Sequence, residues 1–269
     1  MDPPNISSPI LKFFRHIVRR YLARHFHAVR LSSAIQFVDD GRPLIVYANH
    51  SSWWDPMISI FLAESFMPHR NHYAPMDAEA LTRYGILRRV GVFPVEMKTV
   101  RGAAQLIRTG EAILRRGGVL WITPQGQFVD ARCKPLIFKP GLASLATRVS
   151  DSTTSCVVLP LAIEYPFWNE RLPEVLLCFG YPLEVAADET AESLQARMTD
   201  ALDITMGELC NLAVRRDPGA FTTLMLGSRG VGGFYALGKR IKALAFRQPY
   251  QPEHSIREST PMPRGGDDA

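Results

Sequence analysis

The chain has 269 residues, of which 46% are hydrophobic and 21% charged, and it carries a net charge of +5. These values exclude a disordered protein and favour one globular domain with a substantial core. The four cysteines stand far apart without a C-x-x-C pair, which argues against a zinc site or redox pair and fits a reducing cytoplasm. With no apolar run near the ~18 residues that span a bilayer, we expect neither a membrane-spanning segment nor a signal peptide.

The first predicted element is a basic amphipathic helix over residues 11–30. Its apolar residues recur at three- and four-residue steps and so share one face; they are Leu11, Phe14, Ile17, Val18, Tyr21, Leu22, Phe26 and Val29. Most of its basic residues fall on the opposite face; they are Lys12, Arg15, Arg19, Arg20, Arg24 and Arg30. Such a helix is typical of an anionic membrane interface. The alternative is an ordinary packed helix with a solvated basic face.

Strands and helices alternate through the rest of the chain. Apolar runs bounded by turn residues predict strands at residues 34–38, 44–48, 72–76, 92–95, 119–123, 156–163 and 174–179. Helical periodicity predicts helices at residues 57–66, 77–90, 102–116 and 190–215. This alternation predicts an α/β fold: a single domain with a mixed, mostly parallel sheet flanked by helices.

His50 lies where an apolar strand meets a helical pattern, a junction that exposes side chains at the end of a sheet. Asp55 follows five residues later, roughly one and a half helical turns away. A carboxylate there reaches back to one imidazole nitrogen and leaves the other free to take a proton. Because no nucleophile stands in the G-x-S-x-G manner, the pair suits a general base acting on a substrate hydroxyl. The alternative is a helix-capping aspartate beside a surface histidine.

The stretch NHSSWWDP at residues 49–56 resembles the first motif of the glycerolipid acyltransferases, of the lysophosphatidate (1-acylglycerol-3-phosphate) acyltransferase type, whose hallmark is His, four residues, Asp. Three further blocks resemble that family in the same order, at residues 91–95, 124–127 and 156–163. The resemblance covers about residues 40–185. It implies acyl transfer from a thioester, acyl-CoA or acyl-carrier protein, to a lipid hydroxyl. In this chemistry His50 is the base and Asp55 orients it, with no metal and no cofactor besides the co-substrate.

The second block departs from the family at its end. Family members commonly place a basic residue there, which holds the phosphate of the acceptor, but this chain has Glu96. Arg101 follows at the start of a predicted helix, where its side chain and the helix amides are suited to bind an anion. The alternative is a solvated arginine in the first turn of a helix.

The third block, usually Pro-Glu-Gly-Thr followed by Arg, departs further. Gln125 replaces the glutamate, Gln127 replaces the threonine, and Phe128 stands at the usual arginine position. An amide keeps hydrogen bonding without the charge of a carboxylate. The resemblance implies substrate binding by Gln125, Gly126 and Gln127, with Arg132 as a cation downstream, and backbone amides near Gly126 are candidate oxyanion donors.

These departures predict that lysophosphatidate is a poor acceptor and that a neutral, glycosylated or polyprenoid lipid alcohol is a better one. One alternative is that Arg101, Arg132 or Lys134 restores the phosphate site. A second is a catalytically silent membrane-binding relative, which the intact His50 and Asp55 argue against. A third, weaker alternative is thioesterase-like hydrolysis.

Four segments are expected along the chain: an N-terminal amphipathic helical segment at 1–35, the acyltransferase domain at 36–215, an apolar and basic segment at 216–247, and a disordered tail at 248–269. A short basic amphipathic helix is predicted at residues 239–247 within the third segment. The expected partners are membrane lipids and acyl-CoA or acyl-carrier protein, with no nucleic acid. We expect a cytoplasmic protein, peripheral on the inner face of the membrane and held partly by residues 11–30.

Overall fold

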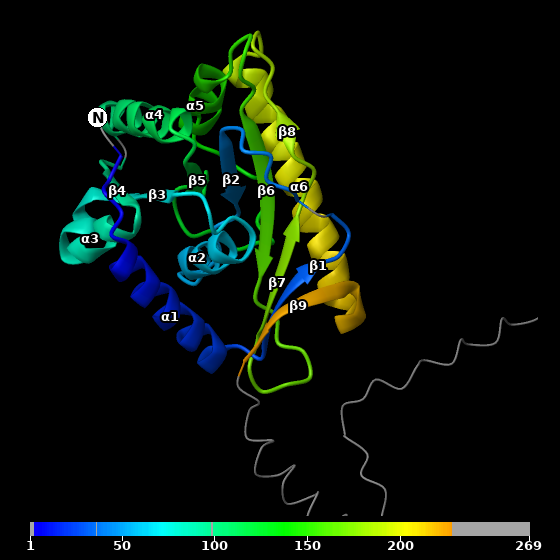
Figure 1. Cartoon of the computed structure of the whole chain (residues 1–269). Helices are drawn as coiled ribbons and strands as arrows, with labels where there is room; N and C mark the ends of the chain where they lie inside the picture. Colours follow the sequence, from blue (N-terminus) through cyan, green and yellow to red (C-terminus); the bar gives the residue numbers. More distant parts are fainter. Residues whose placement is uncertain (1–2, 36, 98, 228–269) are drawn as a thin grey trace, which may run out of the picture.

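The apolar runs of the chain assemble into one mixed sheet in a computed structural model that describes residues 3–35, 37–97 and 99–227 (Figure 1). Its strands are β1 Ala28–Ser32, β2 Leu44–Ala48, β3 His72–Asp77, β4 Val92–Val95, β5 Val119–Ile122, β6 Val157–Glu164, β7 Glu174–Phe179, β8 Leu183–Glu184 and β9 Phe221–Leu226. Its α-helices are α1 Ser8–His25, α2 Asp55–Phe66, α3 Ala78–Arg83, α4 Val100–Arg115, α5 Gly141–Val149 and α6 Ala191–Arg215. Two short 3₁₀ helices are η1 Gly85–Val90 and η2 Pro218–Ala220.

The strand order is β4-β3-β5-β2-β6-β7-β1-β9, and β8 pairs with β6. The pairings from β4 across to β6 are all parallel, as is that of β1 with β7. The pairings β6–β7, β1–β9 and β6–β8 are antiparallel. The predicted fold class, an α/β domain with a mixed and mostly parallel sheet, is therefore confirmed.

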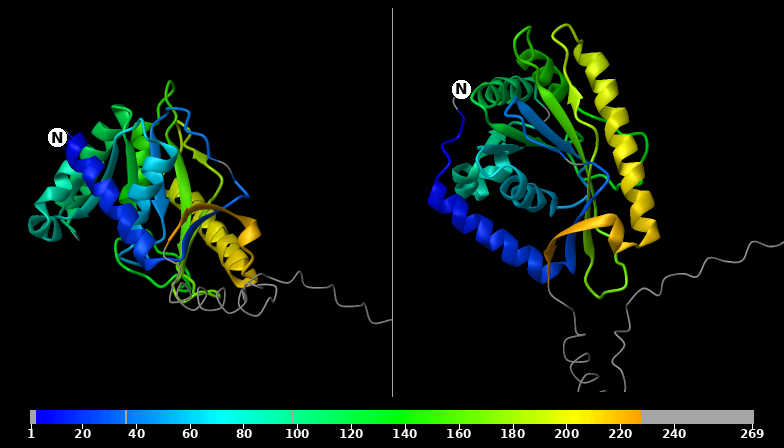
Figure 2. Two further views of the ribbon diagram at one scale, coloured as in Figure 1. Left: turned by 60° about the horizontal axis from the view of Figure 1, so that its bottom comes forward. Right: turned by 45° about the vertical axis from the view of Figure 1, so that its right-hand side comes forward.

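Helices cover both faces of this sheet, which is why its central strands are continuous apolar runs. On one face Ile45 and Tyr47 pack among residues of α4, α5 and α6. On the other face Leu44 and Val46 pack among residues of α1 and α2. Figure 2 shows α1 and α6 on opposite sides of the sheet. The sheet therefore holds β2, the strand that leads to His50, rigidly at the centre of the domain.

The predicted helix at residues 11–30 is corrected at its C-terminal end. α1 ends at His25, and residues 28–32 form β1, every residue of which is buried. β1 is inserted between β7 and β9, so sheet pairing overrides a helical periodicity that continues through these residues. Residues 34, 35, 37 and 38, predicted as a strand, are not part of one.

Arg30 does not lie on a solvated basic face but inside the sheet. Its Nε donates to Glu174 Oε2 at 3.0 Å, and its Nη1 donates to Thr223 Oγ1 at 2.7 Å. The guanidinium also lies 5.9 Å from the centroid of the Trp168 ring. Three strands, β1, β7 and β9, are therefore joined by one buried ion pair and its hydrogen bonds.

The other differences are local. The predicted helix at residues 77–90 is divided into α3 and η1, and β8 and β9 were not predicted. The backbone explains why the second block begins with a glycine. Gly91 has φ of 100°, and a Cβ there would lie 2.1 Å from the carbonyl oxygen of His72.

Within the described ranges, no helix combines the length and the apolar character needed to cross a membrane. The predicted helix at 239–247 and the predicted tail at 248–269 lie outside the described residues. The four-segment division of the chain stays a prediction. In the structure, residues of the first and third segments contribute β1 and β9 to the common sheet.

We predict that Glu174→Ala lowers the free energy of unfolding by about 3–5 kcal/mol, because it leaves the Arg30 guanidinium buried without its partner. Urea denaturation measures this loss. The matched control is Glu184→Ala, which removes one of the two acidic partners of Arg42 at the surface and should cost less than about 1 kcal/mol. Equal losses in the two variants would contradict the prediction.

Candidate active site

The site lies where three neighbouring parallel strands end. His50 follows β2, Gln125 follows β5, and Tyr165 directly follows β6. Because β5, β2 and β6 are adjacent and parallel, their carboxyl ends meet at one edge of the sheet. This edge is where α/β folds place their sites.

His50 and Asp55 form the predicted pair. The Nδ1 atom of His50 lies 2.8 Å from Oδ2 of Asp55, and Asp55 is only 2% exposed. Since a carboxylate only accepts hydrogen bonds, Nδ1 carries the proton and Nε2 is the nitrogen that accepts one from a substrate. Asp55 is also the first residue of α2, where the helix dipole favours a negative charge.

Two further donors hold the Asp55 carboxylate. The backbone N–H of Ser52 donates to Oδ2 at 3.1 Å, and the hydroxyl of Tyr165 donates to Oδ1 at 2.5 Å. Burial, followed by the charge of Asp55, raises the pKa of Tyr165 well above its ordinary value, so the phenol stays protonated. Both carboxylate oxygens are therefore occupied, and the group cannot rotate without losing contacts.

The backbone around His50 is fixed from both sides. Asn49, almost fully buried, donates through Nδ2 to the carbonyl of Ile163 and accepts through Oδ1 from the N–H of Ile163. The N–H of His50 donates to Oε1 of Gln125 at 2.8 Å, and its carbonyl accepts from the N–H of Val129 at 2.7 Å. These contacts tie the end of β2 to the ends of β6 and β5.

The third block therefore has a structural role. Gln125 is buried and uses its amide oxygen to hold the backbone of His50. The N–H of Gly126 donates to the carbonyl of Thr123, which occupies one of the amides expected to face an oxyanion. Gln127 is exposed at the same turn. Substrate contacts by Gln125, Gly126 and Gln127 stay predictions.

Phe128 stands directly beside the base. Its ring centroid lies 4.4 Å from that of His50, with the two planes at 49°. The side chain is otherwise exposed. An aromatic surface thus replaces a cation next to His50.

Within the described residues, none of the predicted cations has a hydrogen bond or ion pair to His50 or Asp55. Arg101 is exposed in the first turn of α4, after β4, which is separated from β2 by β3 and β5. Arg132 points into solvent, with its side chain 89% exposed, and pairs with Asp130. Their hydrogen bonds lower the pKa of Asp130 and raise that of Arg132.

Lys134, the third alternative cation, forms an ion pair with Asp203 of α6. Lys139 is the lysine that sequence reasoning missed. Gly126 has φ of 65°, and a Cβ on it would lie 2.6 Å from the Nζ atom of Lys139. The ammonium group therefore lies over the turn that follows β5. No acidic side chain within the described residues is close enough to form an ion pair with it.

Sequence reasoning also missed Tyr165, for which no local signal exists, and Asn49, whose position next to His50 was a usable signal. His72 is a contrasting buried histidine. Its Nδ1 accepts from the indole N–H of Trp121 and its Nε2 donates to the carbonyl of Met67. Burial lowers the pKa of His72 to about 4, so this ring is neutral and has no nitrogen left for a substrate.

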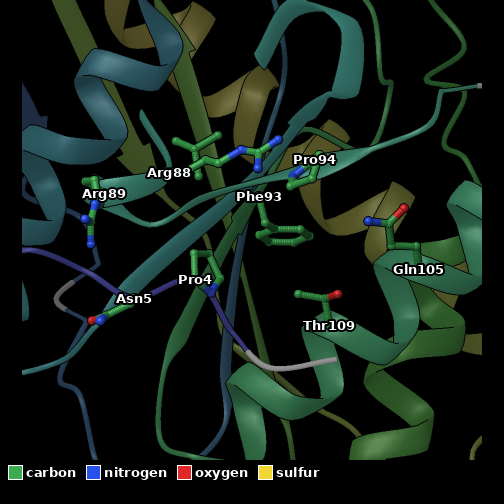
Figure 3. A pocket seen from close by; sticks show the side chains of 9 residues that line it. Pro4, Asn5, Arg88, Arg89, Phe93, Pro94, Gln105 and Thr109 are labelled. Carbon is green, nitrogen blue, oxygen red and sulfur yellow. The ribbon is translucent and has the colours of Figure 1, made fainter. Parts of the chain in front are cut away.

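A separate pocket of about 280 Å³ lies at the β4 edge of the sheet. It is lined by Pro4, Asn5, Arg88, Arg89, Val92, Phe93, Pro94, Gln105 and Thr109. Figure 3 shows Phe93 and Thr109 pointing into it from β4 and α4. None of the predicted site residues lines this pocket. No group of three or more His, Cys, Asp or Glu side chains suited to hold a metal occurs in the part of the chain that the structure describes.

Comparisons with known proteins identify the family and the fold. A family model described as Acyltransferase matches residues 28–164. A lyso-ornithine lipid O-acyltransferase of Rhizobium meliloti strain 1021 is 31% identical over 157 residues, which cover 55% of this chain and 51% of that protein. The chain thus spans about half the length of this curated relative.

Among solved structures, the 1-acyl-sn-glycerophosphate (LPA) acyltransferase PlsC of Thermotoga maritima superposes with a TM-score of 0.54. It is 21% identical, and the match covers 74% of this chain and 79% of that one. At this identity the likeness concerns the fold.

Proposed function

The chain belongs to the Acyltransferase family, and from this premise we propose that it moves a fatty acyl group from a thioester donor to the hydroxyl of a lyso-lipid. The observation that carries this proposal is the hydrogen bond between His50 Nδ1 and the buried Asp55 carboxylate. It leaves Nε2 of a half-buried ring as a base at the open edge of the sheet.

In the proposed reaction, Nε2 of His50 takes the proton of the acceptor hydroxyl while that oxygen attacks the thioester carbonyl. The C–O bond forms, and the tetrahedral intermediate collapses with cleavage of the C–S bond. The leaving thiolate takes the proton back from His50, so the enzyme ends in its starting state. Asp55 stabilises the transient imidazolium, and no covalent acyl-enzyme is involved.

The donor that we propose is acyl-CoA or an acylated carrier protein, with no additional cofactor. Both donors present the acyl group as a thioester, whose thiolate is a good leaving group. A general base is then sufficient for the attack of a hydroxyl. The exposed Phe128 ring beside His50 supplies an apolar surface at the reacting centre.

For the acceptor, we propose a lyso-lipid without a phosphate at the site. A phosphate there needs fixed cations, whereas Phe128 stands next to His50 and both Arg132 and Lys134 are paired with aspartates. The relative named lyso-ornithine lipid O-acyltransferase supports an amino-acid headgroup as one such acceptor. Neutral glycosylated or polyprenoid alcohols remain the second class.

Lys139 is the cation best placed for an acidic group of either substrate. Its ammonium group lies over Gly126, next to Gln125, which contacts the His50 backbone. A single ammonium matches the single charge of a carboxylate on an amino-acid headgroup. We therefore assign Lys139 to the headgroup of the acceptor.

We also propose that α1 lies on the membrane surface. Val18 and Leu22 of this helix pack into the core, but Phe13, Ile17 and Tyr21 are 65%, 42% and 38% exposed. These three recur every four residues and so form an outer apolar stripe beside the exposed Lys and Arg residues of the helix; the latter are Lys12, Arg19, Arg20 and Arg24.

This outer stripe leads toward the active site. The rings of Tyr21 and Trp54 lie 5.3 Å apart, and those of Trp54 and Trp53 5.8 Å apart. Trp53 is exposed in the turn between His50 and Asp55. A bilayer that contacts the stripe would therefore reach the residues that surround the base, which suits a lipid acceptor and a peripheral location at the cytoplasmic side of the membrane.

We predict that His50→Ala reduces acyl transfer by on the order of 10²–10⁴, because the general base is lost, and that Asp55→Asn also impairs turnover by misorienting the ring. Transfer of a labelled acyl chain to a lyso-lipid by purified protein measures both effects. Near-normal transfer by His50→Ala would refute the mechanism. Release of free fatty acid without transfer would instead establish hydrolysis.

With one thioester donor, we predict efficient transfer to a lyso-lipid with an amino-acid headgroup and poor transfer to lysophosphatidate. Lys139→Met should lower kcat/KM for the former about tenfold, since a charge-assisted hydrogen bond contributes roughly 1.5–3 kcal/mol. The matched control, Lys134→Met, removes a lysine already paired with Asp203 and should have little effect. Efficient turnover of lysophosphatidate would overturn the acceptor assignment. An equal loss for every acceptor would place Lys139 at the donor.

The intact protein should co-sediment with anionic vesicles and bind neutral vesicles less, because each basic residue near an anionic surface contributes roughly 1 kcal/mol. Replacing Phe13 and Ile17 by Ser should weaken binding at least tenfold. The matched control replaces Ile204 and Val214 by Ser, two exposed apolar residues of α6, and should leave binding unchanged. Binding that is insensitive to salt and to both pairs of substitutions would contradict this placement.

A further inference from the structure

Tyr165 contacts the catalytic carboxylate on the oxygen that His50 does not use. Its hydroxyl donates to Oδ1 of Asp55 at 2.5 Å, while His50 Nδ1 lies 2.8 Å from Oδ2. The short distance is that of a hydrogen bond to an ionised group. Tyr165 lies 110 residues from Asp55 in sequence and one residue beyond the stretch that the family model matches.

The ring of Tyr165 is held independently of Asp55. It packs against Phe26, with ring centroids 5.7 Å apart. Ile163, two residues before Tyr165, is hydrogen-bonded to the side chain of Asn49, which joins the end of β6 to the end of β2. The hydroxyl is therefore presented to Asp55 by a rigid part of the sheet. Such a donor withdraws negative charge from the carboxylate in proportion to its acidity.

From this geometry we propose that Tyr165 is a positioning residue that sets the basicity of His50 through Asp55. The inference rests on the proposed acyl transfer. With the Tyr165 hydrogen bond in place, the carboxylate holds the His50 ring in its reactive tautomer but stabilises the imidazolium less than an unshared carboxylate would. The Nε2 atom therefore remains unprotonated, and able to act as a base, to a lower pH.

Other titratable groups lie near this unit. Glu164 precedes Tyr165 on β6 and is half-buried. From α1, Tyr21 and His25 contact the Trp54 ring, at centroid distances of 5.3 Å each. Within the described residues, none of these three side chains has a hydrogen bond to Asp55. Their titration is therefore separable by substitution from that of the His50–Asp55–Tyr165 unit.

The first experiment measures the pKa of the His50 imidazole by NMR on ¹⁵N-histidine-labelled protein, assigned with His50→Gln. We expect Tyr165→Phe to raise this pKa by about one unit, because the unshared carboxylate stabilises the imidazolium more strongly. The acid limb of the pH profile of kcat should move upward by the same amount, with about a tenfold loss of kcat below the limb and no change in KM.

The matched control is Tyr47→Phe. Tyr47 is fully buried and donates to the carbonyl of Met198 at 2.9 Å, so this variant also loses a buried hydroxyl but leaves Asp55 untouched. It should lower stability without moving the pKa of His50. Glu164→Gln should likewise leave that pKa in place.

A second variant should shift the pKa of His50 in the opposite direction. A 3-fluorotyrosine at position 165 has a more acidic phenol and is a stronger donor, so it should lower the pKa of His50. This variant keeps the ring and its packing, and it tests the proposal even where Tyr165→Phe does not fold. An unchanged His50 pKa in the fluorinated protein, or in a folded Tyr165→Phe, would overturn the role of Tyr165. Variants that show the expected changes in the pKa of His50, together with a wild-type protein that transfers no acyl group, would contradict the proposed function alone.

Discussion

The burial of one carboxylate constrains the architecture of the whole site. Asp55 is 2% exposed, and an ionised group so far from water is tolerated only where donors surround it. Those donors come from three places: the ring of His50, the N–H of Ser52 and the hydroxyl of Tyr165. They converge because β2 and β6 are adjacent and because α2 begins directly at Asp55. The same contacts that make the charge tolerable orient the imidazole.

The sheet supplies the rigidity that this arrangement needs. Its central strands are buried on both faces, and the buried charges of Arg30 and Glu174 are paired with each other. At the catalytic edge the Asn49–Ile163 and His50–Gln125 hydrogen bonds replace ladder bonds where the strands diverge. The third block therefore holds the backbone of His50 in place through Gln125. A glutamine suits this structural role because only its amide oxygen is used.

The distribution of charge around His50 distinguishes this chain from the pattern expected for a phosphorylated acceptor. Phe128 covers the imidazole at the position where relatives commonly have an arginine, and Arg132 is turned outward to Asp130. The apolar character continues through Trp53 and Trp54 to the outer face of α1. The surface that we propose to face lipid is thus continuous with the surroundings of His50, which favours the proposed acceptor with a weakly charged headgroup.

From the sequence alone, the α/β class and the His50–Asp55 pair were predictable. The alternation of strands and helices indicates the α/β fold class. The His50–Asp55 pair depends only on a local strand-to-helix junction whose geometry is set by the backbone. The partners of that pair were not predictable, because Tyr165 and Lys139 reach the site through strand order and loop packing, which no local pattern encodes. The same reason accounts for the error at residues 28–30: their helical periodicity is local, whereas pairing with β7 and β9 is not. Local interactions brought His50 and Asp55 together, and the tertiary structure decided what surrounds them, because contacts across the sheet depend on the path of the whole chain.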